Sequence, residues 1–274
     1  MRRLLVAALL VMAAPAMAQG VPEAMRGTWT AGSCAAPEAL LHVTARGVVR
    51  LPAEGPARLV RFRALRDQAG WVLATGTGAE APRVMLRADG EALELAEPDT
   101  KLRDDRLPGT TPVTRWLRCQ APGGGLALLH AEGLAFLGTL ERLEAVCQSA
   151  PMAACIAGLI SEADVSHDGL LSVAEVARLL RGAAWALAVQ QGSEADGIAA
   201  AAGLGSIAAL AAARLLVASL DYDEDGRLSA AELGQDRLAF PSGAGSADGR
   251  PGTIEGLAIG AGMLRNLVER LAAE

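Results

Sequence analysis

Two segments of twelve residues, 164–175 and 221–232, repeat one pattern of oxygen-bearing side chains, and no other feature of the chain constrains the fold as strongly. Both segments carry oxygen-bearing side chains at positions 1, 3, 5, 9 and 12, glycine at position 6 and leucine at position 8. Glycine at position 6 permits a left-handed backbone where the chain reverses. A hard cation such as Ca²⁺ takes about six to eight oxygen ligands, and a loop with this spacing supplies them. The repeat therefore predicts two cation-binding loops.

Both loops resemble those of EF-hand calcium-binding proteins at every diagnostic position. The resemblance implies that each loop lies between two helices, that the two helix–loop–helix units pair back to back, and that each loop binds one Ca²⁺ ion. Positions 1, 3, 5, 9 and 12 would bind through side chains, and position 7 through its backbone carbonyl. The implied ligands are Asp164, Ser166, Asp168, Leu170 (carbonyl), Ser172 and Glu175 in the first loop, and Asp221, Asp223, Asp225, Arg227 (carbonyl), Ser229 and Glu232 in the second.

The flanking sequence predicts the helices that such loops require. Apolar residues with helical spacing cover 150–161 and 173–191 around the first loop, and 207–220 and 230–240 around the second. The loops are separated by 45 residues (176–220), about twice the spacing usual in the family, so 192–205 is expected to be an extra helix or a flexible insertion. If the loops pair, Leu171 and Leu228 face each other across a short β-bridge.

The apolar run 197–220 is long enough to raise the question of a membrane span. It is rich in alanine and glycine, contains Arg214 and leads directly into an acidic loop. These features favour a buried helix, and we expect no membrane span in the mature chain.

The N-terminus has the three-part layout of a secretory signal peptide over residues 1–18. Arg2 and Arg3 precede an apolar stretch, which ends in the small-residue sequence Ala16-Met17-Ala18. We therefore expect an exported protein, periplasmic or extracellular, in which the cysteines form disulfides. Four cysteines allow three connectivities, and we favour Cys34–Cys119 with Cys147–Cys155 because each pair then stays within one domain.

Residues 19–120 alternate apolar and polar side chains with period two, between turn sequences such as Ala-Asp-Gly. The pattern predicts a small antiparallel β barrel or sandwich, whose last strand (111–119) returns beside the first. The glycine-rich residues 121–126 are expected to link this domain to a helical domain over 127–274, whose first helix ends near Cys147. The predicted class is α+β with two domains.

The net charge and the motifs that the sequence lacks argue against several functional classes. The formal charge is −6 with no basic cluster, which argues against a nucleic-acid partner. Neither a nucleophile elbow nor a glycine-rich loop between a strand and a helix is present, so no catalytic or organic-cofactor residues are expected.

The sequence therefore predicts an exported calcium-binding protein that binds two Ca²⁺ ions, with a structural or partner-presenting role. The alternative is a small-ligand carrier or an enzyme with its pocket in the β domain, in which calcium only stabilises the fold. The second loop has four carboxylates at ligand positions against three in the first, so it is expected to bind Ca²⁺ more tightly.

Overall fold

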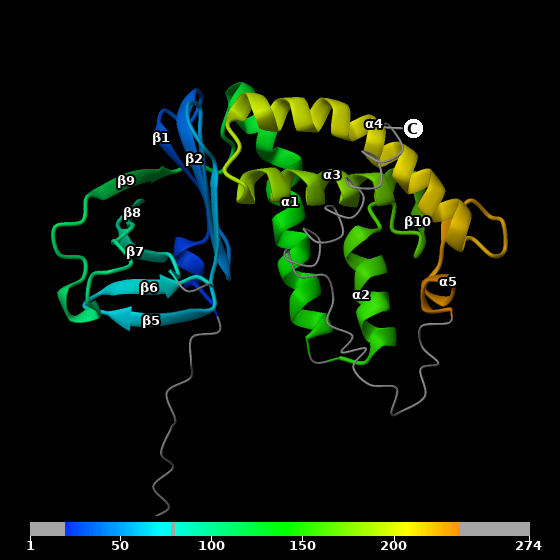
Figure 1. Cartoon of the computed structure of the whole chain (residues 1–274), viewed down its shortest axis with the longest axis horizontal. Helices are drawn as coiled ribbons and strands as arrows, with labels where there is room; N and C mark the ends of the chain where they lie inside the picture. Colours follow the sequence, from blue (N-terminus) through cyan, green and yellow to red (C-terminus); the bar gives the residue numbers. More distant parts are fainter. Residues whose placement is uncertain (1–19, 78–79, 149, 236–274) are drawn as a thin grey trace, which may run out of the picture.

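A computed structural model of the chain describes residues 20–77, 80–148 and 150–235, so the expected signal peptide lies outside the described residues. The fold is α+β, with an antiparallel sheet followed by a helical region (Figure 1). The first part comprises η1 (Glu23–Met25), β1 (Gly27–Gly32), β2 (Pro37–Val43), β3 (Gly47–Pro52), β4 (Arg58–Arg61), β5 (Ala64–Gln68), β6 (Trp71–Thr75), β7 (Arg83–Asp89), β8 (Ala92–Ala96), η2 (Asp104–Arg106) and β9 (Val113–Arg118). The second part comprises α1 (Gly124–Cys147), α2 (Met152–Ala163), β10 (Leu171–Ser172), α3 (Val173–Gln190), α4 (Ala195–Leu220), β11 (Arg227–Leu228) and α5 (Ala230–Gly234).

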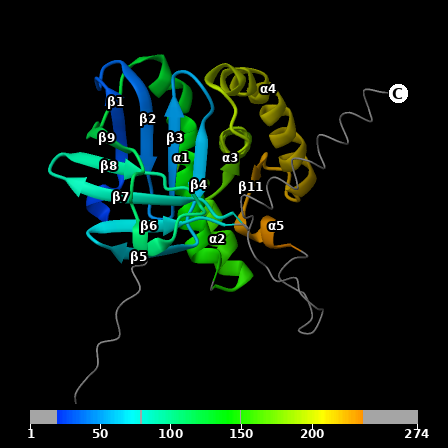
Figure 2. The same ribbon diagram turned by 60° about the vertical axis from the view of Figure 1, so that its left-hand side comes forward.

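The nine long strands form one curved antiparallel sheet, a half-barrel, in the order β4-β3-β2-β1-β9-β8-β7-β6-β5 (Figure 2). The sequence predicted the antiparallel strands, whereas the single half-barrel sheet replaces the expected barrel or sandwich. The last strand does return beside the first, since Trp29 pairs with Arg118 in the β1–β9 ladder. The Cys34–Cys119 disulfide joins the ends of these two strands, as expected.

One face of the half-barrel is filled by its own side chains. Buried residues from β1 to β4 and from β6 to β9 form a single cluster, with the largest contributions from Trp29, Leu41, Leu86, Leu93 and Trp116. The alternation of apolar side chains seen in the sequence places these residues on one face because successive residues of a strand point to opposite sides.

The other face of β2 and β3 packs against the helices. Leu40 and Leu51 share a buried cluster with Leu137 of α1 and with Trp185 and Val189 of α3. The expected linker 121–126 accordingly does not separate two isolated bodies, because α1 already begins at Gly124 and a continuous core joins the sheet to the helices.

A buried polar network reinforces this contact. The carboxylate of Glu141, on α1, accepts hydrogen bonds from Thr44 Oγ1 at 2.5 Å and from the Arg61 guanidinium at 2.7 Å. Arg61 also forms an ion pair with Glu144, one turn further along α1. Because the Glu141 carboxylate is buried, its partners on the sheet offset the cost of removing its charge from water.

The helices form two pairs. The α1–α2 hairpin is closed by the expected Cys147–Cys155 disulfide, and α3 and α4 lie side by side along their length (Figure 1). The residues 192–205, expected to be an extra helix or a flexible insertion, belong to a short turn and to the beginning of the helix α4. The long spacing between the loops is therefore taken up by two long helices.

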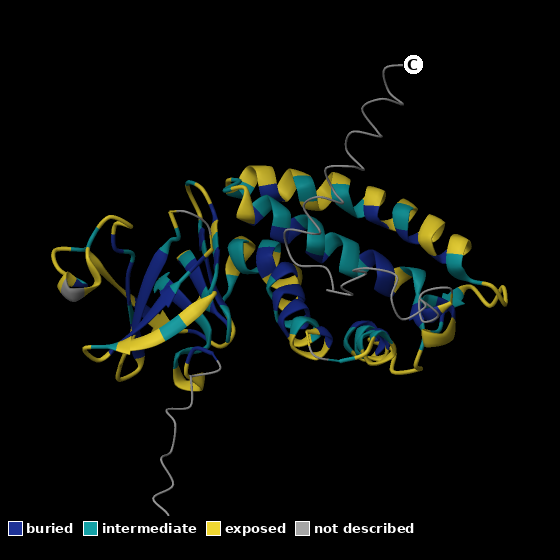
Figure 3. Cartoon of the chain, turned by 60° about the horizontal axis from the view of Figure 1, so that its bottom comes forward, coloured by how far each residue is buried: buried dark blue, intermediate teal, exposed yellow. Residues whose placement is uncertain are grey.

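The expectation that the apolar run 197–220 is a buried helix is wrong for most of its surface. Only a narrow stripe of α4 is buried (Figure 3). Leu204, Ile207 and Leu215 on its outer face are each more than 70% exposed. The helix has the length and apolar composition of a membrane-spanning segment. The stripe is narrow because α4 packs almost entirely on one neighbour, α3.

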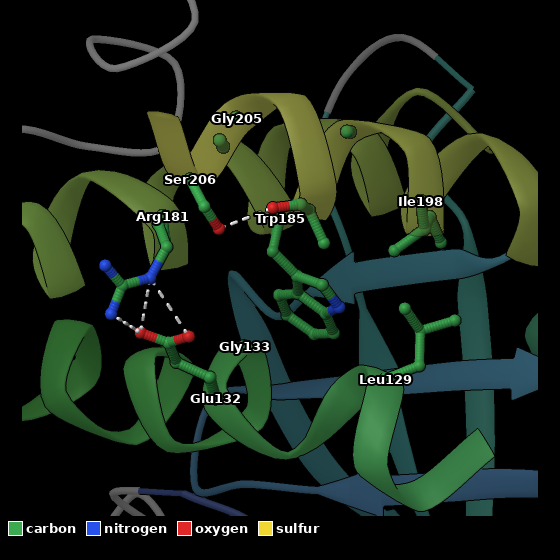
Figure 4. A pocket seen from close by; sticks show the side chains of 11 residues that line it. Leu129, Glu132, Gly133, Arg181, Trp185, Ile198, Gly205 and Ser206 are labelled. Carbon is green, nitrogen blue, oxygen red and sulfur yellow. Dashed lines mark hydrogen bonds and ion pairs between the residues drawn. The ribbon is translucent and has the colours of Figure 1, made fainter. Parts of the chain in front are cut away.

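Helices α1 and α3 approach each other closely where each presents a glycine. Trp185 of α3 lies over Gly133 of α1 (Figure 4), and Phe136 of α1 lies over Gly182 of α3. A Cβ atom at Gly133 would lie 2.0 Å from the Trp185 ring, and one at Gly182 would lie 2.3 Å from Phe136. Larger residues at these positions would push the helices apart.

We therefore expect Gly133→Ala and Gly182→Ala each to lower the free energy of unfolding by about 2–3 kcal/mol, because overpacking forces helix displacement. Gly203→Ala is the matched control, since no atom lies within 4 Å of its added Cβ and alanine favours helix. Urea unfolding should show Gly203→Ala unchanged or slightly more stable. Equal effects at all three positions would contradict the proposed close approach.

His130 lies between α1 and α3 and is 1% exposed. Its Nδ1 accepts a hydrogen bond of 3.0 Å from Trp185 Nε1, so the ring is held neutral, and burial lowers its pKa to about 4. The unfolded chain, with an ordinary histidine pKa, binds a proton that the folded protein rejects between about pH 6.5 and pH 4. Stability is therefore lost as the pH falls through this window.

We expect acidification from pH 7 to pH 5 to remove about 2 kcal/mol of stability through His130. His130→Gln retains a hydrogen-bond acceptor but cannot titrate, so its urea-unfolding free energy should depend less on pH by that amount. An identical pH dependence in the variant and the parent protein would show that His130 is not the titrating group.

Candidate metal centre

The two predicted loops connect α2 to α3 and α4 to α5, and they pair with each other. Strands β10 and β11 are antiparallel, with Leu171 opposite Leu228 and Ser172 opposite Arg227. Leu171 and Leu228 are 1% and 0% exposed, which confirms the β-bridge expected from position 8 of each loop. The pairing holds the two acidic segments side by side.

The two loops have positive φ angles at the same two positions, 4 and 6. The glycines at position 6, Gly169 and Gly226, both have φ of +82°, the left-handed conformation that glycine adopts without strain. At position 4, His167 and Glu224 also have positive φ, of 60° and 61°. Two segments 57 residues apart in the sequence therefore follow one course, as their shared pattern predicts.

The aspartate at position 1 of each loop is bonded to the amides of its own loop. Asp164 accepts hydrogen bonds from the amides of His167 at 2.6 Å and Gly169 at 2.7 Å. Asp221 accepts bonds from the amides of Gly226 at 2.7 Å and Asp225 at 3.1 Å, and the second of these corresponds to the 3.3 Å bond from the Asp168 amide to Asp164. The hydrogen bond from the Gly169 amide contributes most to lowering the pKa of Asp164, so this carboxylate is charged at neutral pH.

The glutamate at position 12 joins the two ends of each loop. Glu175 accepts bonds from the Val165 and Ser166 amides through one oxygen, and from Ser172 through the other, at 2.8–3.0 Å. Glu232 makes the same connections to Tyr222, Asp223 and Ser229. Each forms a capping box with the serine at position 9, which begins the following helix.

These contacts keep both glutamates ionised although their residues are buried. Burial is the largest single effect on the pKa of Glu175 and raises it, but the hydrogen bonds from Ser172, Ser166 and Val165 together outweigh it, and the pKa is lowered. The Ser229 amide is the main cause of the lowered pKa of Glu232. Each loop therefore holds an oxygen-rich group of charged carboxylates.

The second loop concentrates its negative charge. One carboxylate oxygen from each of Asp221, Asp223 and Asp225 lies within 4.8 Å of the others. The hydrogen bond from the Asp225 amide lowers the pKa of Asp223, but desolvation and repulsion by Asp225, Glu232 and Asp221 outweigh it, and the pKa is raised. A cation at this position would relieve the repulsion.

The first loop differs because Asp168, at its position 5, forms an ion pair with Arg227 of the second loop. Among the residues that the structure describes, no group of three carboxylates like that of the second loop is found in the first. Sequence reasoning placed Arg227 only as a carbonyl ligand. The side chain of Arg227 reaches Asp168 because the β10–β11 pairing sets Arg227 opposite Ser172. The sequence alone does not give the register of this pairing.

The donor set of both loops fits a hard cation. Every expected side-chain ligand offers oxygen, and neither loop contains the thiol or imidazole ligands that favour softer metals, except for His167 at a position not expected to bind. The residues present therefore suit Ca²⁺ better than Zn²⁺.

Two of the cavities in the described part of the protein lie between helices, outside the loops. A crevice of about 60 Å³ between α1, α3 and α4 is lined by Trp185 and by the Arg181–Glu132 ion pair (Figure 4). It has room for water but not for a small organic ligand, which needs roughly 300 Å³ or more. A larger apolar groove of about 420 Å³ lies between α1, α2, α3 and α5. The sequence analysis did not identify this groove.

Comparisons of the chain with protein-family models, with curated proteins and with solved structures return no match.

The ion pair between the loops generates a prediction. Removing it with Arg227→Gln frees Asp168 and should strengthen cation binding by the first loop by up to about five-fold, because an exposed pair contributes at most about 1 kcal/mol. Arg214→Gln, which removes an exposed arginine from α4, controls for the change in net charge. Calcium titration by calorimetry gives the affinities. Equal affinities in both variants would show that Arg227 does not compete for Asp168.

Proposed function

We propose that this protein is an exported calcium-binding protein that binds one Ca²⁺ ion in each of two EF-hand-type loops, 164–175 and 221–232. Calcium stabilises the helical region in this proposal. The expected ligand set is the one named from the sequence, with Asp164, Asp168 and Glu175 as the charged ligands of the first loop. Asp221, Asp223, Asp225 and Glu232 are those of the second.

The observation that carries the proposal is the equivalence of the two paired loops. They share left-handed backbone at positions 4 and 6, the same capping box, and the same connections from the glutamate at position 12. An acidic turn formed by chance would not repeat these features, nor would it pair with a second copy across buried leucines. The helices on both sides of each loop support the same interpretation.

A structural role for calcium follows from the environment expected outside the cytoplasm. Free Ca²⁺ at about 10⁻³ M would fill loops whose affinities are of the extracellular type, so these loops would stay loaded and could not report brief changes in concentration. Seven carboxylates at the ligand positions of two adjacent loops repel one another without a cation. Bound ions would neutralise this charge in the loops that connect α2 to α3 and α4 to α5.

Two disulfides support the proposed export, because structural disulfides persist in oxidising compartments. The predicted signal peptide agrees with this location. The alternative of a carrier or an enzyme with a pocket in the β region has no comparable support, since the sheet's own side chains fill the face of the half-barrel that would have to hold a ligand.

Calcium titration of the mature protein by isothermal calorimetry tests the proposal. We expect two sites. Glu232→Gln and Glu175→Gln should each weaken one site by at least about ten-fold, because each removes a charge-assisted contact worth about 1.5–3 kcal/mol. The Glu232→Gln variant should lose the tighter of the two sites.

Glu224→Gln is the matched control, because Glu224 is exposed and occupies position 4, which supplies no ligand. It should bind Ca²⁺ nearly as well as the parent protein. The absence of calcium binding at millimolar concentration would contradict the proposal, and a greater loss from Glu175→Gln would reverse the order of the two sites.

A further inference from the structure

The apolar groove between α1, α2, α3 and α5 is lined almost entirely by hydrophobic side chains. Most of them are only half-buried, and the single charged residue, Glu144, is already paired with Arg61. The lining residues used below are Leu143 of α1, Met152 and Leu159 of α2, Leu179 of α3 and Leu233 of α5. An apolar concavity of about 420 Å³ at the surface has the character of surfaces that bind hydrophobic partners.

The chain leaves the described part of the protein at the edge of this groove. Helix α5 ends at Gly234, immediately after Leu233 in the groove lining. Residues 236–274 lie outside the described residues and begin two positions after Gly234. This segment is thus tethered at the groove rather than at a distant point.

The last part of that segment has a sequence suited to the groove. Its apolar residues recur alternately at spacings of three and four, the pattern that places side chains along one face of a helix. These residues are Ile254, Leu257, Ala261, Leu264, Val268 and Leu271. Glu255, Arg265, Asn266, Glu269 and Arg270 lie between them and would form the opposite face, which is mostly polar although it includes Ile259. An isolated helix of this length is marginal in water, and a groove that buries its apolar face would stabilise it.

The intervening residues 236–253 are rich in glycine, serine and proline and can reach any part of the groove. Fully extended, they span up to about 60 Å, more than the length of any helix that lines it. A tethered segment also has an effective concentration of about 10⁻³ M, which favours it over a second molecule at micromolar concentration.

From these observations we propose that residues 254–271 bind, as an amphipathic helix, in the groove between α1, α2, α3 and α5 of the same chain. The outer face of α4, with Leu204, Ile207 and Leu215, is also apolar and exposed. It is a single convex helix surface, whereas the groove surrounds a ligand with side chains from four helices and buries more of its apolar area. The inference concerns a surface separate from the loops and does not depend on calcium binding.

A photo-crosslinking experiment on the full mature chain tests the proposal. The photoreactive residue p-benzoyl-phenylalanine replaces Leu264 on the apolar face or, as the matched control, Asn266 on the polar face. We expect Leu264 to give cross-links within the same chain, mapped by mass spectrometry to Leu143, Met152 or Leu159. The control at Asn266 should give several-fold less of the same product.

Cross-links from position 264 to α4 around Leu204 and Ile207 would overturn the proposal, and so would cross-links only between molecules. Equal yields from positions 264 and 266, or no cross-link from either, would overturn it as well. A second measurement is the fluorescence of an apolar dye with Leu264→Asp/Val268→Asp. The dye signal should rise several-fold relative to Asn266→Asp if the groove becomes free, and an unchanged signal would contradict its occupation.

Discussion

The two-residue ladder between β10 and β11 is the contact on which the candidate site depends. It places Leu171 against Leu228 in a buried cluster with Ile160 of α2, Val176 of α3 and Val217 of α4. Both loops therefore share one apolar base, and the helices that enter and leave them are held in a fixed relation. A cation bound in one loop would act on the same set of helices as a cation bound in the other.

The second constraint is the core that joins the helices to the sheet. Helices α1 and α3 both contact the half-barrel, and the glycines at their crossing let Trp185 share a buried cluster with side chains of β2 and β3. The buried Glu141 carboxylate, bonded to Thr44 and Arg61, fixes the same contact with polar groups. The sheet thereby provides a rigid support for α1 and α3, and through them for the first loop.

Local patterns in the sequence predicted the strands, the loops, both disulfides and the leucine bridge. Period-two alternation and the spacing of the loop residues involve neighbours in the sequence, and four cysteines allow only three pairings. The strands form one curved sheet instead of a closed barrel or a two-sheet sandwich, and one face of α4 stays exposed. Both features depend on which surfaces pack together in three dimensions. The same is true of the Arg227–Asp168 pair, which exists only once two segments 57 residues apart are in register. The ligand roles of the loop residues remain a prediction.

The most direct test of the central claim is differential scanning calorimetry of the mature protein in millimolar calcium and in excess chelator. At free calcium ten times the dissociation constant, which millimolar calcium reaches for extracellular-type affinities, each site adds about 1.4 kcal/mol of stability. Two sites in a chain of this size should therefore raise Tm by about 5–10 °C. Such a shift, lost in the Glu175→Gln/Glu232→Gln double variant, is the result this account predicts. Coincident unfolding curves with calcium and with chelator would contradict it.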